Sequence, residues 1–149
     1  MKQFFKDIRT GIYNFWFFRK VIWDFRWWDY TFNLELFSKS LEYSAIETAK
    51  KGNHEGSLEN SLNMWKVVDL IEQVKTDVFI DESERQIGYK LKGFDLEPIE
   101  GTDSFRLVDK EGTDKEKSRQ VCELSQKLEK ENWELIWKKL NDEMQNWWD

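Results

Sequence analysis

The sequence predicts a mainly α-helical fold, in which a bundle of four or five helices carries a small antiparallel β-hairpin inserted before the C-terminal helix. Two observations predict it. Along most of the chain, apolar residues recur every three or four positions, which is the spacing of one helix face. Between residues 86 and 109 the spacing changes to two, and glycines and a proline there supply turns.

The composition predicts a single domain with its own core. The chain has 149 residues, of which 40% are apolar and 16% aromatic, and its nine Trp argue against disorder. A chain of this length buries about two-thirds of the surface that it exposes when unfolded. We expect one domain over 1–149, helical over 1–80, with the β element over 86–109 and a C-terminal helix or kinked helix pair over 113–149.

The first two helices are predicted to meet at an aromatic turn. The first helix covers residues 3–20, the turn covers Trp23–Trp28, and Asp29 caps the second helix by accepting a backbone hydrogen bond. Gly52 and Gly56 end the second helix, since glycine readily adopts the positive φ of helix ends. The first helix is expected to pack through Phe5, Ile8, Ile12 and Phe15, and the second through Tyr30, Leu34, Phe37, Leu41, Ala45 and Thr48.

A third helix is predicted to begin at Ser57 and to be interrupted by polar residues 81–85. After the hairpin, Thr113 and Glu116 have the spacing of a capping box that opens the C-terminal helix. A kink is expected after Glu131-Asn132, where the apolar face changes. The third helix is expected to pack through Leu58, Leu62, Trp65, Val68, Ile71, Val74 and Val78, and the C-terminal helix through Val121, Leu124 and Leu128, then Trp133, Trp137, Leu140, Met144 and Trp147.

Charge and aromatic residues are distributed unevenly. Residues 1–28 carry a net charge of +4 and residues 29–149 a net charge of −10, and 13 aromatic side chains lie between Phe4 and Phe32. The longest uncharged run in this basic segment has nine residues, whereas a membrane helix needs about 20 apolar residues. We expect no spanning segment and no signal peptide, and residence in the cytoplasm.

Several landmarks occur together along the chain. Arg9-Thr10-Gly11-Ile12 lies in the first predicted helix, Val21 to Tyr30 includes Trp-Trp-Asp-Tyr, and the chain closes on Trp147-Trp148-Asp149. In this order they resemble a group of small Trp-rich proteins encoded by tailed phages and their prophages. The resemblance implies a phage accessory protein that acts in the cytoplasm of the bacterial host.

No set of residues in the sequence predicts catalysis. The chain has one His and one Cys, and nucleophilic catalysis needs a nucleophile beside an activating base. We expect His54 to be an exposed loop residue and Cys122 a small buried apolar residue of a helix. Phosphate-binding glycine loops and EF-hand spacing do not occur in the sequence. The sequence therefore predicts a protein that is not an enzyme and has no cofactor or metal.

The strongest functional indication is the combination of Trp and basic residues. Aromatic faces stack on nucleobases, and guanidinium and ammonium groups hold phosphates. Most such rings belong to a protein core, but adjacent Trp side chains point about 100° apart on a helix, so some must face a ligand, partner or second subunit. The predicted ligand-binding residues are Lys20, Trp23, Arg26, Trp27, Trp28, Asp29, Tyr30, Trp147 and Trp148.

The favoured hypothesis is a non-enzymatic protein that sequesters a small nucleotide-type ligand, such as a host immune signal, and so counteracts antiviral defence. The alternative is a protein-interaction module that inhibits a host protein or acts in virion assembly. Surplus Trp surface also predicts a homo-oligomer, most simply a dimer.

Two other classes of partner are disfavoured. Double-stranded DNA fits poorly with a net charge of −6. A membrane surface, contacted by residues 1–20 as an interfacial helix, is disfavoured by Asp7 and by the expectation that the apolar face of this helix covers the core. We therefore expect no membrane partner.

Overall fold

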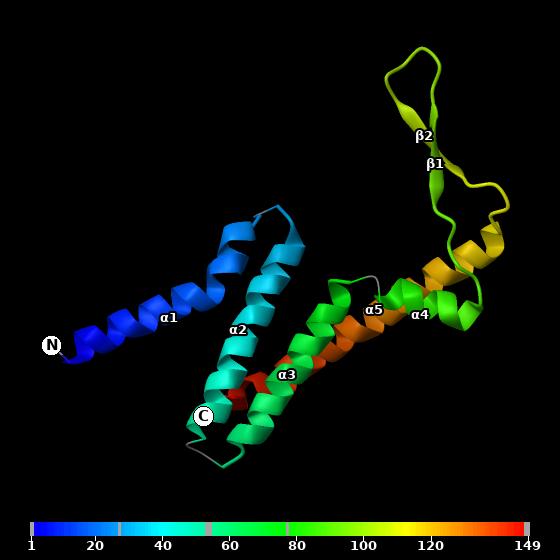
Figure 1. Cartoon of the computed structure of the whole chain (residues 1–149). Coiled ribbons are helices and arrows are strands. Elements are labelled where there is room, and N and C mark those ends of the chain that lie inside the picture. The colour runs from blue at the N-terminus through cyan, green and yellow to red at the C-terminus, as the bar shows by residue number, and fades with distance from the viewer. Residues whose placement is uncertain (1, 27, 53–54, 77, 148–149) are drawn as a thin grey trace. The chain divides into compact units, whose positions relative to one another are not determined.

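The computed structural model describes residues 2–26, 28–52, 55–76 and 78–147. The predicted fold class is confirmed: these residues form five α-helices, a short 3-10 helix and one two-stranded antiparallel sheet before the last long helix (Figure 1). In chain order the elements are α1 (Lys2–Asp24), α2 (Tyr30–Lys51), α3 (Ser57–Val74), α4 (Val78–Ile87), β1 (Phe94–Pro98), β2 (Phe105–Asp109), α5 (Lys115–Glu143) and the 3-10 helix η1 (Met144–Trp147).

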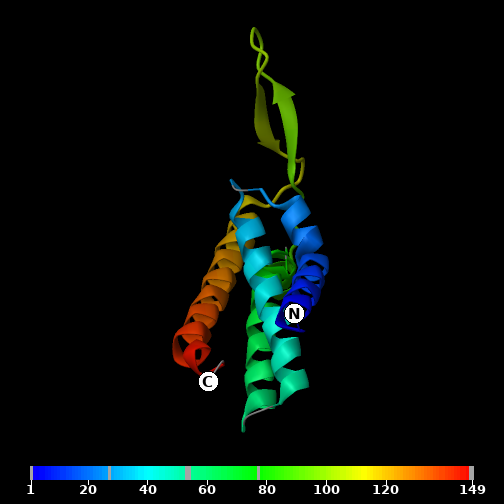
Figure 2. The same cartoon turned by 90° about the vertical axis from the view of Figure 1, so that its left-hand side faces the viewer.

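The chain divides into two compact units, each described separately below. The first unit holds residues 1–75 and 135–149, and the second holds residues 76–134. In the first unit α2 and α3 form an antiparallel pair, with α1 beside α2 (Figure 2). The buried apolar residues of this unit are Val21, Leu41, Ala45, Met64, Val67, Val68, Ile71, Ile136 and Trp147.

The first half of α3 packs through a different face from the predicted one. Leu58, Leu62 and Trp65 are exposed, and Ser57, Ser61 and Met64 are buried. The reason is close approach of the helices: Ser61 Oγ donates a hydrogen bond of 2.9 Å to the backbone oxygen of Ala45 on α2. The small side chains of Ser61 and Ala45 let the two helices approach closely. This contact selects the buried face of α3, although the face with Leu58 and Leu62 has more apolar area.

The predicted packing face of α1 is also wrong. Phe5, Ile8, Ile12 and Phe15 are all exposed. α1 packs on α2 instead through Phe17, Phe18 and the buried Val21. The centroids of the Phe17 and Tyr43 rings lie 5.2 Å apart in an edge-on arrangement, which is favourable for aromatic pairs.

Local signals at the ends of α2 are confirmed. α1 ends at Asp24, and the side chain of Asp29 accepts a hydrogen bond of 2.9 Å from the backbone N–H of Thr31. Gly52 ends α2 with φ of 46°, a conformation that costs glycine little.

The predicted interruption at 81–85 is wrong, because α4 runs through these residues and extends the helical part beyond residue 80. They are polar, but Glu82 accepts hydrogen bonds from Arg85 and Gln86 one turn later. Pairs at this spacing stabilise a helix without an apolar face. Val78, predicted to continue α3, belongs to α4 instead.

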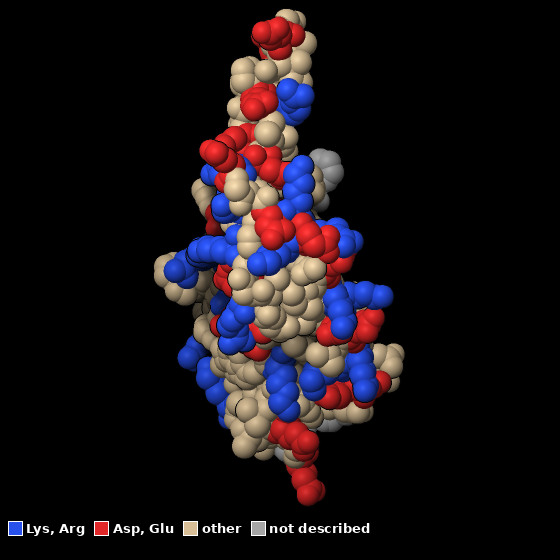
Figure 3. Space-filling model, turned by 90° about the vertical axis from the view of Figure 1, so that its right-hand side faces the viewer, with Lys and Arg blue, Asp and Glu red and all other residues tan. Residues whose placement is uncertain are grey.

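The hairpin of the second unit is shorter than the predicted β element. Phe94 pairs with Asp109 and Pro98 with Phe105. Pro98 is tolerated because each strand of a two-stranded sheet is an edge. The tip between the strands carries acidic side chains, visible in red at the end of the hairpin in Figure 3.

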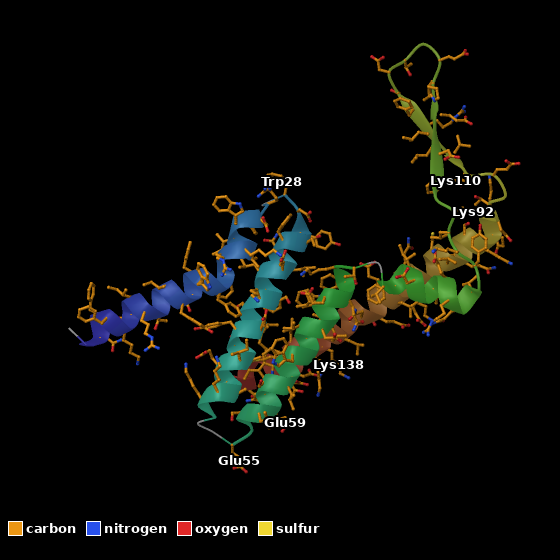
Figure 4. All side chains as sticks on the ribbon, viewed as in Figure 1. Trp28, Glu55, Glu59, Lys92, Lys110 and Lys138 are labelled. Carbon is orange, nitrogen blue, oxygen red and sulfur yellow. The ribbon has the colours of Figure 1, made fainter. Side chains whose placement is uncertain are left out.

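Two contacts fix the base of this hairpin to the start of α5. Lys92 Nζ donates a hydrogen bond of 2.8 Å to the backbone oxygen of Gly112. The Tyr89 hydroxyl accepts one of 2.9 Å from the backbone N–H of Asp114. Figure 4 shows Lys92 and Lys110 at this base.

The C-terminal helix differs from prediction in three ways. Asp114, rather than Thr113, caps it, since its carboxylate accepts a hydrogen bond of 3.1 Å from the N–H of Lys117. α5 continues to Glu143 through the predicted kink, and the short η1 follows it. Cys122, predicted to be buried, is exposed, because the neighbouring Val121 occupies the buried position.

Within α5 the buried positions are also shifted from the predicted face. Asn132 and Ile136 are buried, whereas Trp137 is exposed. Among the described helices, none is long and apolar enough to cross a bilayer.

Candidate functional site

The predicted site at the turn between α1 and α2 presents its rings to solvent. Trp23, Trp28 and Tyr30 are exposed, as are Lys20 and Arg26. The predicted site residues Trp27 and Trp148 lie outside the described residues.

The polar side chains of this turn bond to its own backbone. Arg26 Nη1 donates to the backbone oxygens of Phe25 at 3.0 Å and Asp24 at 3.2 Å. Asp29 caps α2 by accepting a hydrogen bond from the backbone N–H of Thr31, as predicted. The turn therefore offers exposed rings, while its charged groups help to hold the backbone in place.

Trp147 lies far from this turn. It is buried in η1, which contacts α3, and the adjacent Asn146 accepts a hydrogen bond of 2.9 Å from the side chain of Asn60. Asn60 is in the first turn of α3, whereas Trp28 precedes α2, whose 22 residues span about 33 Å. Figure 4 shows Trp28 at one end of α2 and Glu55 and Glu59 beyond the other. Trp147 and the turn are therefore not part of one site within the chain.

A basic groove lies between α1 and α2. Figure 1 shows that the two helices diverge toward the N-terminus of α1, and the residues that line the groove come from this part of α1 and from the C-terminal half of α2. It has a volume of about 380 Å³. We call it the tyrosine groove; it is lined by Lys6, Arg9, Thr10, Tyr13, Tyr43, Glu47, Lys50 and Lys51.

Helix periodicity places these side chains. Lys6, Arg9 and Tyr13 follow one another at spacings of three and four on α1, so they share one face. On α2, Tyr43 and Glu47 are four residues apart, and Lys50 and Lys51 come one turn later. Four basic groups and one carboxylate thus surround the groove.

The two tyrosines form the apolar wall of this groove. Their ring centroids are 5.8 Å apart, with the ring planes tilted by 45°. Burial, and secondly the negative charge of Glu47, raise the pKa of Tyr43 above its ordinary value. Tyrosine is protonated at neutral pH even without this shift, so the hydroxyl of Tyr43 can donate a hydrogen bond.

Glu47 organises the basic groups that α2 contributes. Its carboxylate lies 3.2 Å from Lys51 Nζ and 3.8 Å from Lys50 Nζ. One carboxylate cannot neutralise two ammonium groups, so this end of the tyrosine groove keeps a positive charge beside that of Lys6 and Arg9.

A second groove, of about 350 Å³, lies where α1, α2 and the end of α3 meet. Opposite charges pair inside it: Lys39 lies 2.6 Å from Glu42, and Lys75 lies 2.9 Å from Glu72. Ser38, which is buried, also donates a hydrogen bond of 3.0 Å to Glu72. Its charges are largely balanced, so the tyrosine groove is the better anion site.

Comparisons with protein-family models, with curated proteins and with solved structures give no match to this chain.

The residues of the tyrosine groove were missed from the sequence. The i, i+3, i+7 spacing of Lys6, Arg9 and Tyr13 is a signal on one helix, but the partner residues on α2 lie 30 or more positions later. The Trp-rich turn is more conspicuous because its residues are contiguous.

Among the described residues, no group of three or more His, Cys, Asp or Glu side chains could hold a metal ion. The single histidine, His54, predicted to be an exposed loop residue, lies outside the described residues.

Proposed function

We propose that this protein binds a small phosphate-bearing ligand of nucleotide type in the tyrosine groove and sequesters it without converting it. The observation that carries the proposal is the meeting of four basic side chains with two tyrosine rings around one hollow. Ammonium and guanidinium groups form charge-assisted hydrogen bonds with phosphate oxygens. Tyrosine rings offer a stacking surface for a base.

The size of the groove supports the same class of ligand. Its volume of about 380 Å³ falls within the range of roughly 300–1,000 Å³ that is common for small-molecule sites. A long nucleic acid would need a longer basic track. On the face of the molecule in Figure 3, basic and acidic side chains are intermingled.

Sequestration gives such a site a role without catalysis. For a phage accessory protein, the captured ligand would be a nucleotide signal of the host, whose removal counteracts antiviral defence. The sequence resemblance and the groove together support this role. The support is an analogy and not a demonstrated family relationship.

Calorimetric titration of the purified chain with inorganic phosphate, a mononucleotide and a cyclic dinucleotide tests the proposal. Lys6→Ala should weaken nucleotide binding about tenfold, the usual effect of losing one charge-assisted hydrogen bond. Lys66→Ala removes an exposed lysine of α3 outside the groove and should leave binding unchanged.

Tyr13→Ala tests the contribution of stacking to nucleotide binding separately from the contribution of charge. Losing one stacked base costs about 1–3 kcal/mol, so the nucleotides should bind at least fivefold more weakly, whereas inorganic phosphate should be unaffected. Absence of measurable heat with all three ligands at millimolar concentration would contradict the proposal.

A protein-interaction module is the second candidate, and the hairpin favours it. Phe94, Leu96, Phe105 and Leu107 are all exposed, and the register places them on one face of the sheet. Two-stranded hairpins are only marginally stable alone, so an apolar face of this kind fits contact with a protein partner, either a host protein or, in virion assembly, a second copy of the chain. Sedimentation analysis should show self-association that Leu107→Glu abolishes.

A further inference from the structure

One side of α1 is an apolar stripe that stays largely open within its own unit, where only Trp16 reaches the groove between α1, α2 and the end of α3. Its residues recur at helical spacing and are all exposed: Phe4, Phe5, Ile8, Ile12, Phe15 and Trp16. The opposite side of the helix, with Phe17, Phe18 and Val21, makes the contact with α2. Within its own unit the stripe is therefore left open to a partner.

The stripe is bordered by positive charge. Residues 2–24 carry five Lys or Arg and two Asp, although the whole chain has a net charge of −6. Arg9 follows Ile8 directly, and Lys20 comes four residues after Trp16. Both basic residues therefore lie at one edge of the stripe. The guanidinium carbon of Arg19 lies 3.8 Å from the centroid of the Trp16 ring, and its Nη1 donates a hydrogen bond of 2.6 Å to the backbone oxygen of Trp16.

We infer that α1 is an interfacial helix that binds an anionic lipid surface, with the stripe in the boundary between headgroups and acyl chains. Phe, Trp and Ile on one face with Lys and Arg beside them are the composition of helices that lie in this boundary. Tryptophan and arginine suit it because each has an apolar body and a polar end. The helix lies on the surface and does not cross it.

Two objections from the sequence no longer hold. The first was that this face must cover the core, and the structure uses the other side of α1 for that purpose. The second was the charge of Asp7. This residue lies on the edge of the stripe opposite Arg9, where it accepts a hydrogen bond of 2.7 Å from Gln3, and the five basic residues of α1 outnumber its two Asp.

Charge complementarity favours lipid over a second copy of the chain. Residues 2–24 carry a net charge of +3, so two copies paired through the stripe would bring two positively charged helices together, and like charges repel. Lipid phosphates would face the same helix with the opposite charge.

Flotation of the full chain with vesicles tests this inference. The protein should float with vesicles that contain phosphatidylglycerol, should float less with pure phosphatidylcholine, and should dissociate as salt is added. Ile12→Glu should reduce binding about tenfold or more, which corresponds to losing the burial of one isoleucine side chain.

Leu58→Glu is the matched control, because Leu58 and Ile12 are both 66% exposed and Leu58 lies on α3. It should leave flotation unchanged. Failure of the unaltered chain to float, or equal losses in both variants, would overturn the inference. So would a lipid-free dimer that Ile12→Glu converts to a monomer in the absence of vesicle binding.

The same variant separates this inference from the proposed function. Ile12 does not line the tyrosine groove, so Ile12→Glu should retain nucleotide binding while it loses vesicle binding. Lipid binding without nucleotide binding, or the reverse, shows which of the two surfaces is misassigned.

Discussion

The hydroxyl of Ser61 on α3 donates a hydrogen bond of 2.9 Å to the backbone oxygen of Ala45 on α2, and both residues are buried. Neither side chain is large. Their contact brings the two helix backbones close together, and it determines which face of α3 is turned toward the core.

Ala45→Leu should therefore destabilise the fold. Added methylene groups in a packed contact cost about 1–3 kcal/mol, and chemical denaturation would measure this loss. Ala49→Leu, four residues later on the same helix and exposed, should change the free energy of unfolding by less than about 0.5 kcal/mol. Equal effects in the two variants would show that α2 and α3 do not meet closely at Ala45.

Trp147→Ala and Trp23→Ala should have very different effects on the melting temperature. Trp147 is 1% exposed and Trp23 is 85% exposed. Truncation of a buried Trp costs about 3–5 kcal/mol, so Trp147→Ala should lower the melting temperature by many degrees. Trp23→Ala should leave it nearly unchanged, and a large loss there would mean that the ring is part of a core.

Alkaline pH should weaken the fold through Tyr43. Its pKa is raised in the folded chain, so the unfolded chain releases this proton at lower pH than the folded chain does. The contribution to stability is complete below the ordinary tyrosine pKa and is lost as pH rises through the folded value. Tyr43→Phe should flatten the dependence of the melting temperature on pH above about 10. An unchanged slope would contradict the raised pKa.

Alanine substitutions at two glycines should change the stability of the fold in opposite directions. Gly112 has φ of 73°, and an added Cβ would lie 2.9 Å from Lys92 Nζ, so Gly112→Ala should cost about 1–2 kcal/mol. Gly11 lies within α1 with open space around it, so Gly11→Ala should stabilise the helix by roughly 0.5–1 kcal/mol. Unfolding followed by circular dichroism measures both, and the same sign for the two changes would contradict the assigned backbone.

The sequence by itself determined the features that depend on neighbouring residues. The Asp29 cap, the Gly52 end of α2 and the hairpin before the last helix were all predicted correctly, because a cap or turn needs groups only a few positions apart. The exposure of Trp28 at the turn follows from the same local geometry.

Tertiary structure alone decided which faces are buried. Between residues 13 and 18 almost every side chain of α1 is apolar or aromatic, so periodicity offered two acceptable faces, and contact with Tyr43 on α2 selected the one with Phe17. On α3, apolar area favoured Leu58, but close approach at Ala45 selected Ser61. The tyrosine groove exists only because helices α1 and α2 bring Tyr13 and Tyr43 together across 30 positions of sequence, and no local pattern specifies how two helices meet.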